Sequence, residues 1–183
     1  MSQDPDLALS DLRILDLTRA VAGPTCTRML VEMGADVIKV EAAPNGDLTR
    51  AVSVYRNERS LYFIQQNRGK KSFCVNMKDP RGIALVAELV SQVDAVVENF
   101  RPGVMEAIGL GYDRLREIKS DIILCSISSF GQTGPLAERP GYDFIAQAYS
   151  GIMSMIGEPG EVPNLVGAAI GDASTGVHAA LGI

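Results

Sequence analysis

Short apolar segments alternate with helix-like segments along this chain of 183 residues, and this pattern constrains the fold most strongly. We expect strands at residues 12–18, 36–41, 72–76, 95–98 and 122–126. The last two strands, AVVE and IILCS, are almost continuously apolar, which is typical of strands covered on both faces. The alternation predicts an α/β, Rossmann-like fold: a mostly parallel sheet with flanking helices and right-handed crossovers.

Helices are expected between these strands. The clearest one follows Asp79 and Pro80, which suit the N-cap and the first helical position, and its apolar residues from Ile83 to Val90 recur at the spacing of a buried face. The polar segment 42–71 has room to run over the surface. Further helices are expected from the turn at Gly23 to near Gly34, around 104–118, over 142–153 and from Asp172 onward.

An α/β chain of this kind invites comparison with dinucleotide-binding proteins. Glu41 ends the second strand, where such folds hold a ribose. However, the first turn reads RAVAGP over 19–24 and lacks the G-x-G-x-x-G pattern that lets the backbone approach a pyrophosphate. A Walker loop and a G-x-S-x-G nucleophile elbow are also absent from the sequence, so neither a nicotinamide cofactor nor serine hydrolase chemistry is expected.

Composition excludes several further classes. The three cysteines stand about fifty residues apart with one histidine in the chain, so we expect reduced, partly buried thiols and no metal site. A net charge of −5 argues against a nucleic-acid surface. No apolar run approaches the roughly 18 residues of a membrane span. The first ten residues lack the features of a secretory signal, so the expected location is the cytoplasm, with an organelle matrix as the alternative.

Two groups of residues could hold an anionic ligand. One is a basic cluster within residues 68–81, for which a solvated, charged edge is the competing interpretation. The other is the turn NFRPG after the fourth strand, at the end of the sheet where parallel folds bind ligands. There, Asn99 could hydrogen-bond, Phe100 could stack on a purine and Arg101 could meet a phosphate. The cluster consists of Arg68, Lys70, Lys71, Lys78 and Arg81.

Asp172 is the candidate nucleophile, because it follows Gly171 at the start of the last predicted helix. Its simplest role is that of a helix N-cap. Backbone donors at a helix start would also keep its carboxylate ionised, the form that attacks a carbonyl carbon. His178 lies six residues later, off the same helical face, and a packed or hydrogen-bonded role is the simpler interpretation of it.

Several ordered motifs together resemble the class III CoA-transferase family, which includes formyl-CoA transferase, carnitine CoA-transferase and, by fold, α-methylacyl-CoA racemase. The similarity runs along nearly the whole chain. Its motifs are LDLTRAVAGP (15–24), GADVIKVE (34–41), GDLTR (46–50), NRGKKSFCVNMKDPRG (67–82), VENFRPGVMEAIGLGY (97–112), FGQTGP (130–135), PGYD (140–143) and GD (171–172).

The resemblance implies a role for each matching residue. Asp172 matches the nucleophilic aspartate of the family, which accepts CoA through a mixed anhydride and an aspartyl-CoA thioester. The positions that match the family's CoA site are Ala22, Val75, Lys78, Asn99, Phe100 and Arg101. The implied substrates are an acyl-CoA thioester and a small carboxylic acid, with no metal or redox cofactor required.

The resemblance also implies an organisation and leaves alternatives. Family members are about twice as long and form interlocked homodimers, so residues 1–183 would be the N-terminal part of the large CoA-binding domain, without the small second domain and the C-terminal return. An acyl-CoA racemase is the nearest alternative, but Tyr142 occupies the position of its catalytic histidine. A truncated, non-enzymatic CoA-binding domain is the third hypothesis. The family usually has a glycine where this chain has Ser129.

Overall fold

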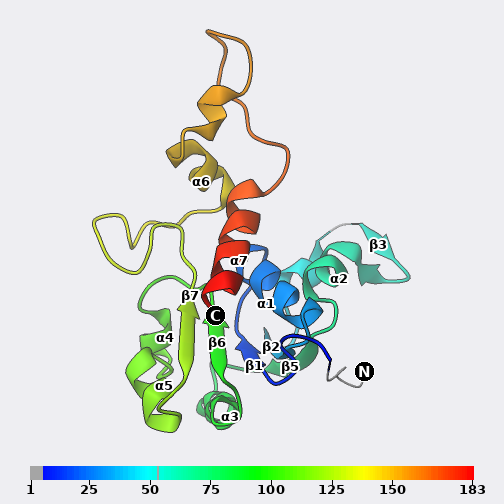
Figure 1. The fold of residues 1–183 in the computed structure, drawn as a ribbon, viewed down its shortest axis with the longest axis vertical. Coiled ribbons are helices and arrows are strands. Elements are labelled where there is room, and N and C mark those ends of the chain that lie inside the picture. Colours follow the sequence, from blue (N-terminus) through cyan, green and yellow to red (C-terminus); the bar gives the residue numbers. More distant parts are fainter. Residues whose placement is uncertain (1–5, 53) are drawn as a thin grey trace.

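A computed structural model describes residues 6–52 and 54–183 and contains a parallel sheet of five strands (Figure 1). The strand order is β5-β2-β1-β6-β7, and every pairing between these neighbours is parallel. The predicted α/β fold is therefore confirmed. The strands are β1 (Arg13–Asp16), β2 (Asp36–Ala42), β5 (Lys71–Val75), β6 (Ala95–Glu98) and β7 (Ile123–Ser126), each within three residues of its predicted bounds.

Helices cover both faces of the sheet. Because successive side chains of a strand point to opposite faces, adjacent residues of β1 pack against different helices. Leu15 packs with the residues of α3 (Pro80–Val90) and α5 (Tyr112–Ile118), whereas Ile14 packs with those of α1 (Ala22–Glu32) and α7 (Ile170–Gly182). The predicted cap of α3 is confirmed, since the Asp79 carboxylate accepts the amide N–H of Arg81 at 2.9 Å. The short α4 (Val104–Ala107) precedes α5.

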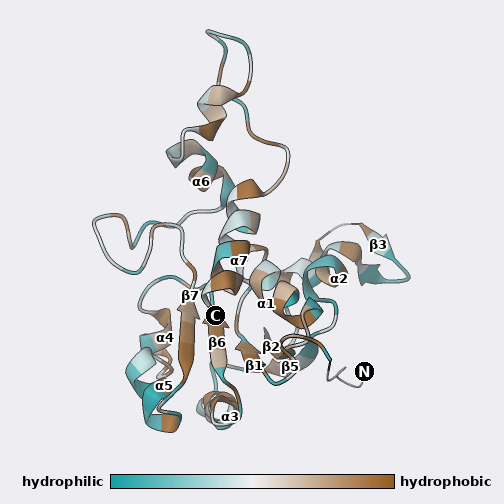
Figure 2. Cartoon of the chain, in the orientation of Figure 1, coloured by the Kyte–Doolittle hydropathy of each residue, from teal (hydrophilic) through white to brown (hydrophobic). Residues whose placement is uncertain are grey.

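Strand β7 differs from the prediction. It lies at the edge of the sheet, and although Figure 2 colours it as hydrophobic, Ile123 is 41% exposed. The expectation that both apolar strands are covered on two faces is therefore correct for β6, all of which is buried, and wrong for β7. An apolar run indicates that a strand tends to be buried, but it does not show which residues would pack against its second face.

The segment 42–71 is more structured than expected. It contains the 3-10 helix η1 (Leu48–Ala51), a hairpin of β3 (Tyr55–Arg56) and β4 (Arg59–Ser60), and the helix α2 (Leu61–Asn67). The hairpin projects from the body (Figure 1), but α2 packs beside α1, where Gln66 accepts a hydrogen bond from Thr25. The hairpin fits the predicted surface excursion, and α2 runs over the surface of α1 with Gln66 and Asn67 as its buried residues.

The C-terminal third forms an arm and then returns to the sheet. Helix α6 (Asp143–Tyr149) is followed by the 3-10 helix η2 (Ile152–Met155), so the single helix expected over 142–153 is divided. A long loop leads back to α7, which lies against α1 (Figure 1). Within the described residues, no helix is long and apolar enough to span a membrane.

Candidate functional site

A pocket opens beyond the carboxyl ends of three neighbouring strands, β1, β6 and β7. Its walls are the loops that follow these strands, the PGY segment before α6, and the first turns of α7. This is the edge of a parallel sheet where ligands bind, because loops from several strands converge there.

Five of the seven site residues expected from the sequence line this one pocket. They are Ala22, Asn99, Phe100, Arg101 and Asp172, although up to 150 residues separate them in the chain. Val75 and Lys78 do not line it. Val75 ends β5 and is buried in the core, while Lys78 lies in the turn that leads to α3.

The expected basic cluster does not converge on the pocket. Four of its five side chains form separate ion pairs along the chain, and Lys78 also lies outside the pocket lining. The competing interpretation of a charged edge therefore describes most of this cluster better, with Lys70 as a buried exception. The pairs are Arg68–Glu32, Lys70–Asp16, Lys71–Asp36 and Arg81–Asp79.

Asn99 makes its contacts within the protein. Its side-chain oxygen accepts the Arg19 amide N–H at 2.8 Å, and its side-chain nitrogen donates to the Arg19 carbonyl oxygen at 2.8 Å. The Arg19 guanidinium lies 4.9 Å from the centre of the Phe100 ring. Asn99 therefore holds the loop after β1, a contact different from the ligand hydrogen bond considered from the sequence. Arg101 is exposed at the pocket and forms no ion pair within the described residues.

Close helix packing places Asp172 in the pocket. A Cβ atom on Gly176 of α7 would lie 2.6 Å from the carbonyl oxygen of Ala22 in α1, so only glycine allows this approach of the two helices. A Cβ atom on Gly171 would likewise lie 2.9 Å from the Cβ of Ala146. Gly171 and Gly176, one on each side of Asp172, thus allow the close packing of α7 against α6 and α1 that determines the position of Asp172.

The expected N-cap role of Asp172 is wrong. Helix α7 begins at Ile170, and Asp172 lies inside its first turn. Burial raises the pKa of the Asp172 carboxyl, and the nearby negative charge of Asp143 raises it further. No hydrogen bond to this carboxylate occurs within the described residues. The environment therefore opposes ionisation, contrary to the expectation, and makes the ionised carboxylate more basic.

Asp143 and Tyr62 belong to the same neighbourhood, and neither was expected as a site residue. The Asp143 carboxylate is buried and accepts the Asp172 amide N–H at 3.0 Å. Burial raises the pKa of Tyr62, and the charges of Asp172 and Asp143 raise it further. The PGYD motif could have indicated Asp143. No sequence pattern indicated Tyr62 as a site residue, because the helix that carries it, α2, was not predicted.

His178 lies outside the pocket lining, and its Nδ1 donates a hydrogen bond to the Ser174 carbonyl oxygen at 2.8 Å. This agrees with the simpler, hydrogen-bonded interpretation.

Ser129 lines the pocket, and its hydroxyl donates to the carbonyl oxygen of Gly141 at 2.9 Å. The serine at this position therefore joins the loop after β7 to the PGYD segment.

The described residues contain no group of three or more His, Cys, Asp and Glu side chains that could hold a metal ion. The thiols differ in their exposure: Cys26 is buried, Cys125 is half-buried and Cys74 is exposed, so the expectation of partial burial is wrong for Cys74. Burial raises the pKa of Cys26 to about 12, with a further contribution from Cys125, which leaves this thiol protonated and unreactive.

Comparisons with known proteins agree on one family. The sequence model of CoA-transferase family III matches residues 9–183. Succinyl-CoA:glutarate CoA-transferase of Mus musculus is 48% identical over 172 residues, which cover 93% of this chain and 39% of the mouse protein. Succinate–glutarate CoA-transferase of Agrobacterium fabrum is 44% identical, covering 93% of this chain and 44% of that protein.

A solved structure shows the same fold. The crystal structure of a CAIB/BAIF family protein from Brucella suis superposes with a TM-score of 0.91 at 40% identity, over 96% of this chain and 48% of that one. The chain therefore spans about two fifths to one half of the length of the relatives it matches.

Proposed function

The chain belongs to CoA-transferase family III, and from this premise we propose that its pocket binds an acyl-CoA thioester and that the protein transfers CoA to a free carboxylic acid. One observation carries the proposal: Asp172 shares a single pocket with the wall formed by Asn99, Phe100 and Arg101. A carboxylate in the same pocket as the proposed CoA-contacting wall is the arrangement that attack on a bound thioester requires.

We propose that Asp172 is the nucleophile. Its carboxylate attacks the thioester carbonyl, so that a mixed anhydride forms and CoA leaves as the thiolate. The thiolate then attacks the aspartyl carbonyl, which releases the first acid and leaves CoA on Asp172 as a thioester. The acceptor carboxylate attacks this thioester, giving a second anhydride and the thiolate. Attack of the thiolate on the acceptor carbonyl yields the new acyl-CoA and restores Asp172.

The surroundings of Asp172 suit this chemistry. Burial and the charge of Asp143 raise its pKa, and a more basic carboxylate is a stronger nucleophile once ionised. The racemase alternative needs an imidazole beside the thioester. The histidine of this chain, His178, does not line the pocket, and Tyr142, which does, is 74% exposed. No observation favours the racemase.

We propose a dicarboxylic acid as the acid substrate. The charged residues that line the pocket are Arg101, Arg139 and Asp172, a surplus of one positive charge. Arg139 donates to the Tyr149 hydroxyl at 3.3 Å and forms no ion pair with any described residue. A guanidinium that lines the same pocket as Asp172 can bind the second carboxylate of such an acid. The two relatives above are named for succinate and glutarate, both dicarboxylic acids.

Arg139→Leu in the intact protein tests this assignment. Loss of a hydrogen bond between charged groups, about 1.5–3 kcal/mol, should raise the KM for succinate or glutarate roughly 10- to 100-fold. The KM values for acetate and for the acyl-CoA donor should stay unchanged. An equal rise for acetate and succinate would contradict the role, and a rise for acyl-CoA alone would mean that Arg139 binds a CoA phosphate instead.

The organisation of the whole protein is a further proposal. We propose that residues 1–183 form the N-terminal part of a large CoA-binding domain and that the protein works as a homodimer. Light scattering of the intact protein measures the second point directly: a monomeric mass for an active enzyme would contradict it.

Mass spectrometry of the intact protein after incubation with succinyl-CoA tests the central proposal. We expect a covalent adduct on Asp172 that hydroxylamine removes, and no adduct in Asp172→Ala. The Asp172→Ala variant should still bind CoA in calorimetry, since the proposed CoA wall lies on another loop. An adduct elsewhere, or CoA transfer by Asp172→Ala, would refute the mechanism. Binding of CoA without transfer by the natural protein would favour the non-enzymatic alternative.

A further inference from the structure

The loop between β1 and α1 forms part of the pocket wall through Ala20 and Val21. Ala20 has a φ of 63°, in the left-handed region that residues with a side chain seldom occupy. Such a conformation persists only where the surroundings hold it in place. The residues that hold this loop therefore decide the shape of one side of the pocket.

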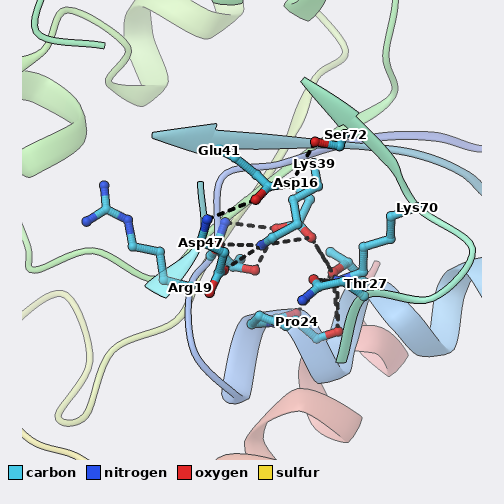
Figure 3. A network of polar contacts seen from close by, with 12 residues as sticks. Asp16, Arg19, Pro24, Thr27, Lys39, Glu41, Asp47, Lys70 and Ser72 are labelled. Carbon is cyan, nitrogen blue, oxygen red and sulfur yellow. Dashed lines mark hydrogen bonds and ion pairs between the residues drawn. The ribbon is translucent and has the colours of Figure 1, made fainter. Parts of the chain in front are cut away.

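A buried ion-pair network lies beneath this loop (Figure 3). The Lys39 side chain is 2% exposed, and its ammonium group donates to the carbonyl oxygen of Thr18 at 2.8 Å. The same ammonium lies 3.1 Å from Asp47 and 3.9 Å from Asp16. A buried ammonium needs partners for its protons, and one of its partners is the backbone of the loop itself.

The Asp16 carboxylate also binds Thr18. It accepts the amide N–H of Thr18 at 2.8 Å and the Thr18 hydroxyl at 2.5 Å. Lys39 thus binds the carbonyl oxygen of Thr18 and Asp16 binds its amide N–H, while the nearer cation of Asp16 is Lys70. Asn99 binds both backbone groups of Arg19, the next residue. Two consecutive residues are fixed immediately before Ala20, so the network transmits its geometry to the pocket wall.

A second buried lysine provides an internal comparison. The ammonium of Lys70 donates to Asp16 at 3.0 Å, to the carbonyl oxygen of Pro24 at 3.1 Å and to Asn67 at 2.9 Å. Lys70 therefore shares Asp16 with Lys39, but its backbone contact lies in α1 and not in the loop. The two lysines have similar burial and the same anionic partner, and they differ in which backbone segment they hold.

We propose that Lys39 is a positioning residue that shapes the β1–α1 loop for acyl-CoA binding. Buried ion pairs contribute little net stability, because desolvation offsets the attraction between the charges. The specific consequence of this pair is geometric: it places the loop that ends in Ala20 and Val21. This inference rests on the proposed function and names a residue that acts on the CoA site without touching the ligand.

Lys39→Met in the intact protein tests the proposal by steady-state kinetics, with Lys70→Met as the matched control. We expect the KM for acyl-CoA to rise at least tenfold in Lys39→Met, while the KM for the acid changes less than twofold. Lys70→Met should lower stability as well, but because the contact of Lys39 with the Thr18 carbonyl oxygen remains, it should raise the KM for acyl-CoA less than Lys39→Met does. Equal changes of this KM in both variants would mean a general structural role and would overturn the proposal.

A second variant serves if Lys39→Met does not fold. Lys39→Met/Asp47→Asn also removes the carboxylate that would otherwise be left without its cation, and asparagine can still accept the Thr49 amide N–H that Asp47 accepts at 2.8 Å. The same selective rise in the KM for acyl-CoA is expected. If the double variant folds and its KM for acyl-CoA is unchanged, the positioning role is wrong and the proposed function stands. An inactive natural protein would overturn both.

Discussion

The amide N–H of Asp172 donates to the carboxylate of Asp143 across 3.0 Å, so the backbone of one acid is held by the side chain of another. Gln147 donates to the second oxygen of the same carboxylate at 2.5 Å. Asp143 therefore fixes the first turn of α7 and also places a negative charge near the Asp172 carboxyl, whose pKa rises through burial and through this charge. One residue thus controls both the position and the basicity of the proposed nucleophile.

The first prediction concerns the dependence of the transfer rate on pH. Since only ionised Asp172 attacks, the rate should fall at acidic pH with a midpoint above 3.8, the ordinary pKa of this side chain. Asp143→Asn removes the neighbouring charge and keeps an acceptor for the Asp172 amide, so the midpoint should move to lower pH. The measurement is a profile of kcat against pH. Glu138→Gln, at an exposed site outside the pocket lining, is the control and should leave the midpoint in place. A midpoint that does not move in Asp143→Asn would contradict the coupling.

The second prediction concerns the stability cost of Asp172. A carboxyl whose pKa is raised by folding destabilises the folded state once it ionises, because the unfolded chain then releases its proton more easily. Asp172→Asn should therefore raise the melting temperature at pH 7, by about 2–4 °C for each kcal/mol recovered. The gain should disappear below the ordinary pKa, where both states are protonated. Calorimetry at pH 7 and pH 3 measures this.

Asp113→Asn is the matched control for that experiment. Asp113 also lies in the first turn of a helix, α5, but it is exposed. Its loss removes a favourable interaction with the helix dipole, about 0.3–1 kcal/mol, and should lower the melting temperature slightly. If both substitutions change stability in the same direction, burial does not make ionised Asp172 costly.

The third prediction concerns the contact between α1 and α7. Gly176→Ala adds a methyl group 2.6 Å from the Ala22 carbonyl oxygen, so the helices must move apart. We expect a loss of about 1–3 kcal/mol in the free energy of unfolding, reduced by the better helix propensity of alanine, and a lower kcat because α7 carries Asp172. Gly182→Ala, where the new atom would meet nothing within 4 Å, is the control. Urea unfolding and kinetics of the two variants check this, and equal behaviour would refute the role of the contact.

Much of the fold could be predicted from the sequence because its signals are local. Strand β6 is found at the expected residues 95–98, and Asp79 caps α3 as its spacing with Pro80 indicates. The turn at Asn99–Arg101 lines the pocket, as expected for parallel strands, whose loops converge at one edge of the sheet. Local sequence patterns thus predict the parallel sheet and the edge of that sheet, at the carboxyl ends of its strands, where we propose that the ligand binds.

The errors concern contacts between distant segments. The pKa of Asp172 is raised first by burial and then by Asp143, which lies 29 residues earlier and also accepts the Asp172 amide N–H. Lys70 was expected in a basic cluster or a charged edge, yet the fold buries it, together with Lys39, around Asp16. Periodicity and capping rules describe neighbours in the sequence, so they do not reveal which buried charges will meet.

The last prediction concerns Glu41, which stands where dinucleotide-binding folds hold a ribose, although the sequence lacks the glycine motif of such a site. The Glu41 carboxylate accepts four hydrogen bonds within the protein. Arg50 donates two of them, at 2.6 and 2.7 Å, the Ser72 hydroxyl donates one at 2.7 Å, and the Asp47 amide N–H donates one at 2.8 Å. Burial opposes the charge, but these donors prevail and lower the pKa of Glu41 from 4.5 to about 2. This site therefore serves the fold, since its acceptors are already occupied by protein donors.

The sign of the pH effect follows from that lowered pKa. Glu41 contributes stability that is fully present above pH 4.5 and is lost as the pH falls toward 2. Glu41→Gln should lower the free energy of unfolding at pH 7 by about 1–3 kcal/mol, because it weakens hydrogen bonds to a charged group. It should also flatten the acid dependence between pH 4.5 and 2. Glu117→Gln, which breaks an exposed pair with Arg114, should change both quantities little. Urea unfolding across this pH range decides: parallel stability curves for the natural protein and Glu41→Gln would show that Glu41 is not the group that titrates.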